Sequence, residues 1–184
     1  MAVFEEALHV RGVPFAWASG ETWNEGTRWV VCACAGSLSS RVLSGLRAAR
    51  KAGAVVTLAP HAPTLDEAWR PLAAAEDVSD FEVVGSPSSA QAQALVERRI
   101  DVLGLDAWPV SPSSLYVCVH EDSAGKARVV FAMNPTSAPA VARVSIAGVV
   151  SLVDALDGVR VDAHAGACAI PVPPRAVRLM AVEG

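Results

Sequence analysis

Residues 151–182 read SLVDALDGVRVDAHAGACAIPVPPRAVRLMAV, and this stretch decides the fold of the end of the chain. Its apolar residues come in short runs, which are separated by two glycine-containing turn signals and by the pair Pro173-Pro174. Short runs bounded by Gly, Asp and Pro are typical of antiparallel β-structure. We therefore predict strands over residues 151–155, 159–163, 167–172 and 176–182.

The same pattern extends upstream of this stretch. Apolar runs at residues 115–120, 128–134 and 141–146 follow at hairpin spacing, with no helical pattern between them. Repeated short strands of this kind predict a small antiparallel β-sandwich. Pro109 and Pro112 indicate a linker before it, so we place a domain boundary near Trp108 and expect an N-terminal half over residues 1–108 and a C-terminal half over residues 109–184.

The N-terminal half alternates strands and helices. Its clearest element is WVVCACA at residues 29–35, a nearly continuous apolar run typical of a strand buried on both faces of a parallel sheet. The alternation predicts an α/β domain with a mostly parallel sheet. The other predicted strands cover residues 13–18, 54–59 and 81–85, and the predicted helices cover residues 2–10, from Ser37 or Ser39 to 51, from Thr64 onward, and 88–103.

Composition limits the classes of function. Apolar residues make up 52% and charged residues 18% of the 184 residues, which fits a compact domain, and the net charge of −4 includes no basic cluster for nucleic acid. No apolar run reaches the roughly 18 residues that span a bilayer. Glu5 and Glu6 stand where a signal peptide is basic, so we expect a cytoplasmic protein. Buried free thiols are expected at Cys32, Cys34, Cys118 and Cys168, which all fall in predicted strands.

Several motifs of the C-terminal half resemble the small β domain that ends many glycoside hydrolases. They are the turn from Asp154 to Gly158, the apolar-Pro-Pro corner at residues 170–174, the final strand at 177–180 and the corner from Phe131 to Asn134. The N-terminal half in turn resembles the domain that precedes this tail in family 42 β-galactosidases. The matching stretches are residues 29–35, 38–51, 52–56 and 60–63.

The resemblance implies a flavodoxin-like sheet of the class I amidotransferase type, known in that family as the trimerisation domain, followed by a β-sandwich tail. Those enzymes carry both catalytic glutamates in a TIM barrel that comes first. A barrel needs about 250 residues, more than this chain has. The resemblance therefore implies a C-terminal part of a longer polypeptide, or a separate subunit, that is inactive alone.

Two acidic pairs are catalytic candidates, because a retaining glycosidase needs two carboxylates about 5–5.5 Å apart. Glu21 and Glu25 are expected in a solvated loop or a helix turn. Asp154 and Asp157 are expected in a turn, where Asp serves backbone geometry. We predict no catalytic role for either pair.

Nucleophile and metal motifs are also incomplete. An amidotransferase places Cys at a strand-to-helix turn, but Cys32 and Cys34 are expected within a strand, on one face and away from its end. No second Cys or His pair stands at zinc spacing, and Ser37 lacks the Gly-x-Ser-x-Gly motif. We therefore expect no catalytic residue, no metal and no cofactor, with an active amidotransferase as a minor alternative.

Trp17, Trp23 and His61 are the candidate binding residues. They fall near the carboxyl ends of predicted parallel strands, where α/β folds bind ligands. Sugar rings stack on tryptophan, so Trp23 is a candidate for lining the pocket of a neighbouring barrel. The alternative is that Trp17, Trp23 and Trp29 are core or interface anchors.

Two functions follow from these patterns. The first is a non-catalytic oligomerisation region of a family 42-like glycoside hydrolase, which self-associates, as a trimer in the family, or docks onto a chain that carries the barrel. The second is a free-standing carbohydrate-binding or scaffold protein that has lost the enzyme. Neither involves nucleic acid or a membrane.

Overall fold

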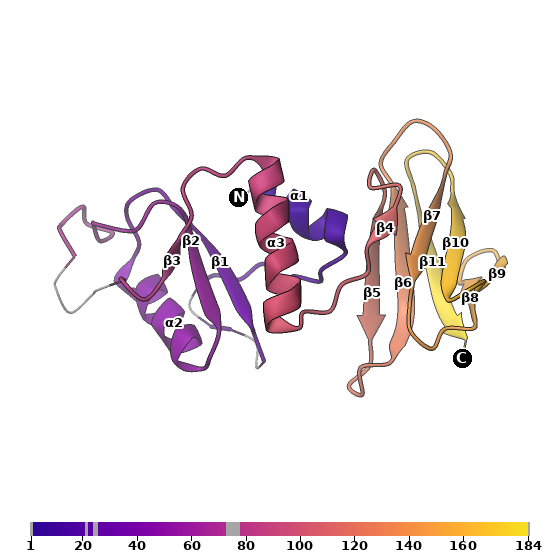
Figure 1. Ribbon diagram of the computed structural model, residues 1–184, viewed down its shortest axis with the longest axis horizontal. Helices are drawn as coiled ribbons and strands as arrows, with labels where there is room; N and C mark the ends of the chain where they lie inside the picture. Colours follow the sequence, from indigo (N-terminus) through magenta and orange to yellow (C-terminus); the bar gives the residue numbers. More distant parts are fainter. Residues whose placement is uncertain (1, 21, 24–25, 73–77, 184) are drawn as a thin grey trace.

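The structure, a computed structural model, describes residues 2–20, 22–23, 26–72 and 78–183, in which an α/β half and an all-β half lie side by side (Figure 1). The elements of the α/β half are α1 (Ala2–Arg11), β1 (Trp29–Cys34), α2 (Ser40–Lys51), β2 (Val55–Pro60), β3 (Glu82–Val83) and α3 (Ser89–Leu103). The all-β half contains β4 (Val110–Ser111), β5 (Tyr116–Glu121), β6 (Ala127–Asn134), β7 (Ala140–Ser145), β8 (Ser151–Asp154), β9 (Arg160–Asp162), β10 (Ala167–Val172) and β11 (Ala176–Glu183).

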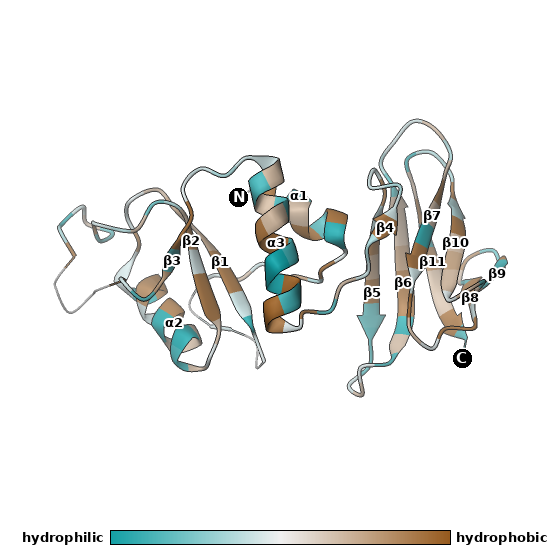
Figure 2. Cartoon of the chain, viewed as in Figure 1, coloured by the Kyte–Doolittle hydropathy of each residue, from teal (hydrophilic) through white to brown (hydrophobic). Residues whose placement is uncertain are grey.

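The α/β half has three layers. Its described strands form a parallel sheet in the order β1-β2-β3. Alternate residues of β1 and β2 face opposite layers: Val30 and Val56 pack against α2, whereas Trp29 and Ala59 pack toward α1 and α3. Both faces of the sheet are thus covered by helices, which explains why β1 and β2 are among the most hydrophobic ribbons in Figure 2.

A polar network is buried under α3. The hydroxyl of Thr57, a fully buried residue of β2, donates to Glu82 Oε2 at 2.7 Å and accepts from Trp29 Nε1 at 2.9 Å. Arg99 of α3 donates to the same carboxylate, and its guanidinium lies 5.9 Å from the Trp29 ring centre. Burial raises the pKa of Glu82, but the hydrogen bonds from Thr57 and Arg99 outweigh it and hold that pKa below its ordinary value. The network ties β1, β2, β3 and α3 together.

Two helices of this half begin as the sequence predicts. Ser39 caps α2 by accepting from Val42 N at 3.2 Å. Ser88 begins α3 with a capping box, in which Ser88 and Gln91 exchange side-chain and backbone hydrogen bonds. The prediction of a helix at residues 2–10 is also confirmed by α1.

Two predicted elements of this half are wrong. Residues 13–18 form no strand and instead run as irregular chain. No helix begins at Thr64, because Asp66 Oδ1 accepts from the backbone of Ala68 and Arg70 and closes a tight loop. Glu67, expected in the first turn of that helix, instead accepts from Ser40 N at 2.8 Å and so serves the start of α2.

The all-β half is a sandwich of two antiparallel sheets, ordered β10-β7-β4 and β5-β6-β11-β8-β9. The predicted strands of this half are confirmed, and β4 is an additional short strand inside the expected linker. The buried side chain of Asn134, at the corner that ends β6, donates to Val172 O at 3.1 Å and Ala138 O at 2.8 Å. This asparagine therefore links the larger sheet to β10 of the smaller one.

The two halves meet at Gly12, directly after α1. Gly12 has φ +63°, and its carbonyl accepts from Trp108 N at 3.0 Å. A Cβ atom at this position would lie 1.9 Å from Trp108 O, so only glycine allows this approach. Trp108 in turn packs against the core of the sandwich.

The buried network predicts the effect of a near-isosteric change. Thr57→Val removes the hydroxyl and leaves the Trp29 N–H and one Glu82 oxygen without that partner, which should lower the free energy of unfolding by about 2 kcal/mol. Thr57→Ser keeps the hydroxyl and is the matched control. Denaturant unfolding measures both, and equal stability losses in the two variants would contradict a role for the hydroxyl.

Candidate docking site

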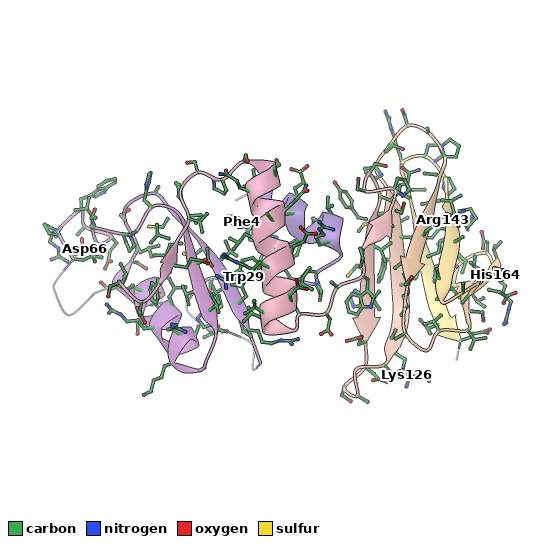
Figure 3. All side chains as sticks on the ribbon, in the orientation of Figure 1. Phe4, Trp29, Asp66, Lys126, Arg143 and His164 are labelled. Atoms are coloured by element: carbon green, nitrogen blue, oxygen red, sulfur yellow. The ribbon has the colours of Figure 1, made fainter. Side chains whose placement is uncertain are left out.

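A groove of about 820 Å³ runs along the outer edge of β1, and we call it the β1 groove. Trp29 to Ala33 form its inner wall, and residues 13–20 form much of its rim. Phe4 and Leu8 of α1 line it from one layer, and Val42 of α2 from the other. Figure 3 shows Phe4 and Trp29 close together between the sheet and the helices, with ring centres 6.5 Å apart.

Backbone pairing explains why this edge is open. Val55 N donates to Arg28 O and His61 N donates to Cys34 O, so even-numbered residues of β1 pair with β2. In a parallel strand the main-chain groups of alternate residues point to opposite sides. The main-chain groups of Trp29, Val31 and Ala33 therefore point into the groove. In the part of the chain that the structure describes, no strand pairs with this edge.

Trp17 stands on the rim of the β1 groove and is 68% exposed. It belongs to an aromatic patch that we define as His9, Phe15, Trp17 and Tyr116. The ring centres lie 6.3 Å apart for Phe15 and Trp17, 5.0 Å for His9 and Phe15, and 5.0 Å for His9 and Tyr116. The patch spans both halves, because Tyr116 of β5 joins three rings from residues 9–17. Of its members, only Trp17 is expected from the sequence, because no sequence pattern brings Tyr116 to this part of the chain.

Trp23 also lines the groove but is held by its own chain. Its indole Nε1 donates to Gly45 O of α2 at 2.8 Å, and its ring packs against the core between the sheet and α2. His61, in contrast, is exposed in the loop after β2 and is not part of the groove. The structure thus brings Trp17 and Trp23 to one site and leaves His61 apart.

Charged groups at the groove are partnered. Arg28 donates to Asp106 Oδ2 and to Leu103 O, each at 3.2 Å, and His9 lies 4.0 Å from Glu5. The remaining lining is predominantly apolar or aromatic. Across the described residues there is no group of three or more His, Cys, Asp or Glu side chains that could hold a metal ion. The described helices also include none long and apolar enough to cross a membrane.

The cysteines occupy strands as predicted, but Cys34 is the last residue of β1 and so lies at its end, contrary to the expectation. Cys34 and Cys168 are buried, Cys32 and Cys118 are half-buried, and all four are free thiols. Burial, with a smaller contribution from the charge of Cys34, raises the pKa of Cys32 to about 11. Cys32 is therefore a neutral thiol at neutral pH.

The other catalytic candidates are two acidic pairs, one of which the structure does not describe and the other of which stabilises a turn. Glu21 and Glu25 lie outside the described residues. Asp154 is buried, accepts from Leu156 N at 2.8 Å and pairs with Arg178 at 3.0 Å. Asp157, which also pairs with Arg178, has its pKa lowered by the Val159 N–H and by that arginine. Both aspartates thus hold the turn between β8 and β9.

Comparison with known proteins shows a similarity of fold to several solved structures. No family model and no curated protein matches the sequence. Solved structures do match: Gan42B, a GH42 β-galactosidase from G. stearothermophilus (TM-score 0.69, 11% identity), a β-galactosidase from Bacillus circulans sp. alkalophilus (0.66, 13%) and an exo-carrageenase GH42 from Bacteroides ovatus (0.65, 14%). The matches cover 97–98% of this chain and 35%, 37% and 26% of those enzymes. The chain therefore shares the fold of a quarter to somewhat over a third of such an enzyme.

The pKa of Cys32 sets how fast its thiol is alkylated. At pH 8 only about one Cys32 in a thousand is a thiolate, so native labelling by iodoacetamide should be slow and rise about tenfold per pH unit toward pH 11. Mass spectrometry of digested protein measures the rate, and labelling in denaturant is the control. Rapid native labelling that levels off near pH 8.5 would contradict the burial of this thiol.

Proposed function

We propose that the chain is a non-catalytic assembly region of a glycoside hydrolase that resembles the family 42 β-galactosidases. In this proposal residues 1–108 form an amidotransferase-like oligomerisation domain and residues 109–184 a β-sandwich tail. The TIM barrel, with its activity on β-galactosides, belongs to another part of a longer polypeptide or to a partner. We take the assembly to be cytoplasmic.

The observation that carries the proposal is the extent of the fold match. Both halves align together over 97–98% of this chain, in the order α/β then β, with only 26–37% of each enzyme. Two unrelated domains that matched by chance would not be expected to keep their order and mutual placement. The contact of Gly12 with Trp108 supports a fixed pair of halves that acts as one module.

The aromatic patch supports a role in assembly. Exposed aromatic rings are enriched where proteins associate. Trp17 is 68% exposed and Phe15 is 38% exposed, whereas Trp23 is engaged within its own chain. We therefore assign the intermolecular contact to Trp17 and a positioning role to Trp23, so that self-association, or docking to a barrel-bearing chain, uses the α/β half.

A free-standing carbohydrate-binding protein is the second candidate. The exposed ring of Trp17 favours it, because tryptophan faces stack on sugar rings. The two candidates differ in what Trp17 contacts: a protein surface in the first, a soluble sugar in the second. Titration with galactose and galacto-oligosaccharides separates them, when tryptophan fluorescence is followed in the parent chain and in Trp17→Ala, because the chain has five tryptophans.

Assembly is tested by sedimentation velocity across a wide range of chain concentrations. The parent chain should associate, and Trp17→Ala should weaken association roughly 30-fold, which corresponds to about 2 kcal/mol for an aromatic anchor. Trp23→Ala should instead lower stability, because it removes the packing and the hydrogen bond to Gly45.

The matched control is Trp69→Ala, which removes a 75% exposed ring outside the β1 groove and should leave association unchanged. A parent chain that stays monomeric at all concentrations and recovers no barrel-bearing partner in a pull-down would contradict the assembly role. The isolated chain should also fail to hydrolyse a chromogenic β-galactoside. Turnover above a buffer blank would contradict its non-catalytic nature.

A further inference from the structure

We infer that the β1 groove is a slot for one added β-strand, supplied by an extended apolar segment of a partner polypeptide. The inference rests on the proposed function, because it specifies how the assembly region holds the barrel-bearing chain. The added strand would bind through the main chain of β1, whereas the aromatic patch would bind through exposed side chains. The two can therefore be tested separately.

The first argument is the unprotected edge of β1. Natural sheets protect an exposed edge with lysine, proline, a bulge or a very short strand. β1 has the sequence WVVCAC, contains none of these residues, and pairs with β2 without a register shift. Among the described residues, no strand pairs with the main-chain groups of its odd-numbered residues, and the Ala33 carbonyl accepts only from Cys32 Sγ at 3.7 Å, so β1 is suited to accept a neighbouring strand.

The second argument is that helices already flank the empty position. Phe4 and Leu8 of α1 line the groove on one side of the sheet plane, and Leu38 and Val42 line it on the other. These layers are the ones that cover β1 and β2. A strand beside β1 would be covered on both faces, as the strands of parallel sheets are.

The dimensions and chemistry of the slot define its occupant. β1 has six residues, about 20 Å of strand, and the groove volume of about 820 Å³ lies in the range of pockets that bind ligands. Apolar side chains face the slot from both layers, so the occupant must be apolar on both faces. A continuous run of small and β-branched residues meets this requirement.

The rim of the groove favours a single strand over the edge of a second copy. Residues 13–20, Phe4 and Leu8 of α1, and Val42 line the groove together with β1. A whole sheet with its own helical layers would meet these segments before its edge reached β1. A lone extended segment, in contrast, needs only the width of one strand, about 4.8 Å.

The test uses the full chain and a fluorescein-labelled probe peptide. The probe has six alternating valine and alanine residues, matched to the length of β1, and lysines at both ends for solubility. A control peptide of the same sequence carries N-methyl groups on the three residues whose N–H groups pair with β1, which blocks the ladder and keeps the side chains. Fluorescence anisotropy should show saturable binding of the probe and none of the control.

Protein variants place the contact on β1. The N–H of Val31 points into the groove, so Val31→Pro removes an edge donor and leaves the hydrogen bonds to β2. It should weaken probe binding at least tenfold, while Val31→Ala, which keeps the donor, should bind within a few-fold of the parent. Circular dichroism and thermal unfolding check that both variants fold.

Several outcomes would overturn the inference. They are equal binding of the probe and its N-methylated control, no binding of either, or full binding by a folded Val31→Pro. If Val31→Pro fails to fold, the two peptides on the parent chain decide the matter. Release of chain self-association by the probe would assign the slot to a second copy. Persistent self-association with no probe binding would overturn the strand slot and leave the proposed function standing.

Discussion

The parallel pairing of β1 with β2 is the constraint on which the rest of the α/β half depends. It sends the side chains of Val30 and Cys32 toward α2 and those of Trp29 and Val31 toward α1 and α3. The same register turns the main-chain groups of the odd residues away from β2. The register of β1 with β2 therefore determines both the packing of the core and the open edge of the sheet. Thr57 secures the arrangement, because its hydroxyl ties Trp29 to Glu82 in the buried layer.

Most elements could be predicted from local sequence, and the exceptions have physical reasons. WVVCACA, the serine caps and the hairpin spacing of the tail all correspond to observed elements. Residues 13–18 are apolar enough for a strand, but a strand exists only where it has a partner, and these residues line the β1 groove without pairing with a described strand. The acidic residues after Thr64 are typical of a helix start. In the structure, however, Asp66 accepts a hydrogen bond from its own loop, and Glu67 accepts one from the first turn of α2. A sequence pattern does not show which backbone N–H groups will donate hydrogen bonds to a given carboxylate.

The candidate site was predictable in part. Trp17 and Trp23 were expected at a binding surface, and both line the β1 groove. Their different situations were not predictable, because the partner of Trp23 is a carbonyl of α2 and Trp17 has neighbours from both halves. The fold of the chain is shared with 26–37% of the length of several GH42 enzymes.

Amide hydrogen exchange in the free chain, followed residue by residue by NMR, tests the open edge most directly. The amides of Val30 and Cys32 pair with β2 and should exchange slowly, whereas those of Val31 and Ala33 point into the groove and should exchange much faster. This alternation along one strand is the result the account predicts. Equal, strong protection of all four amides would show that the edge is already paired and would contradict it.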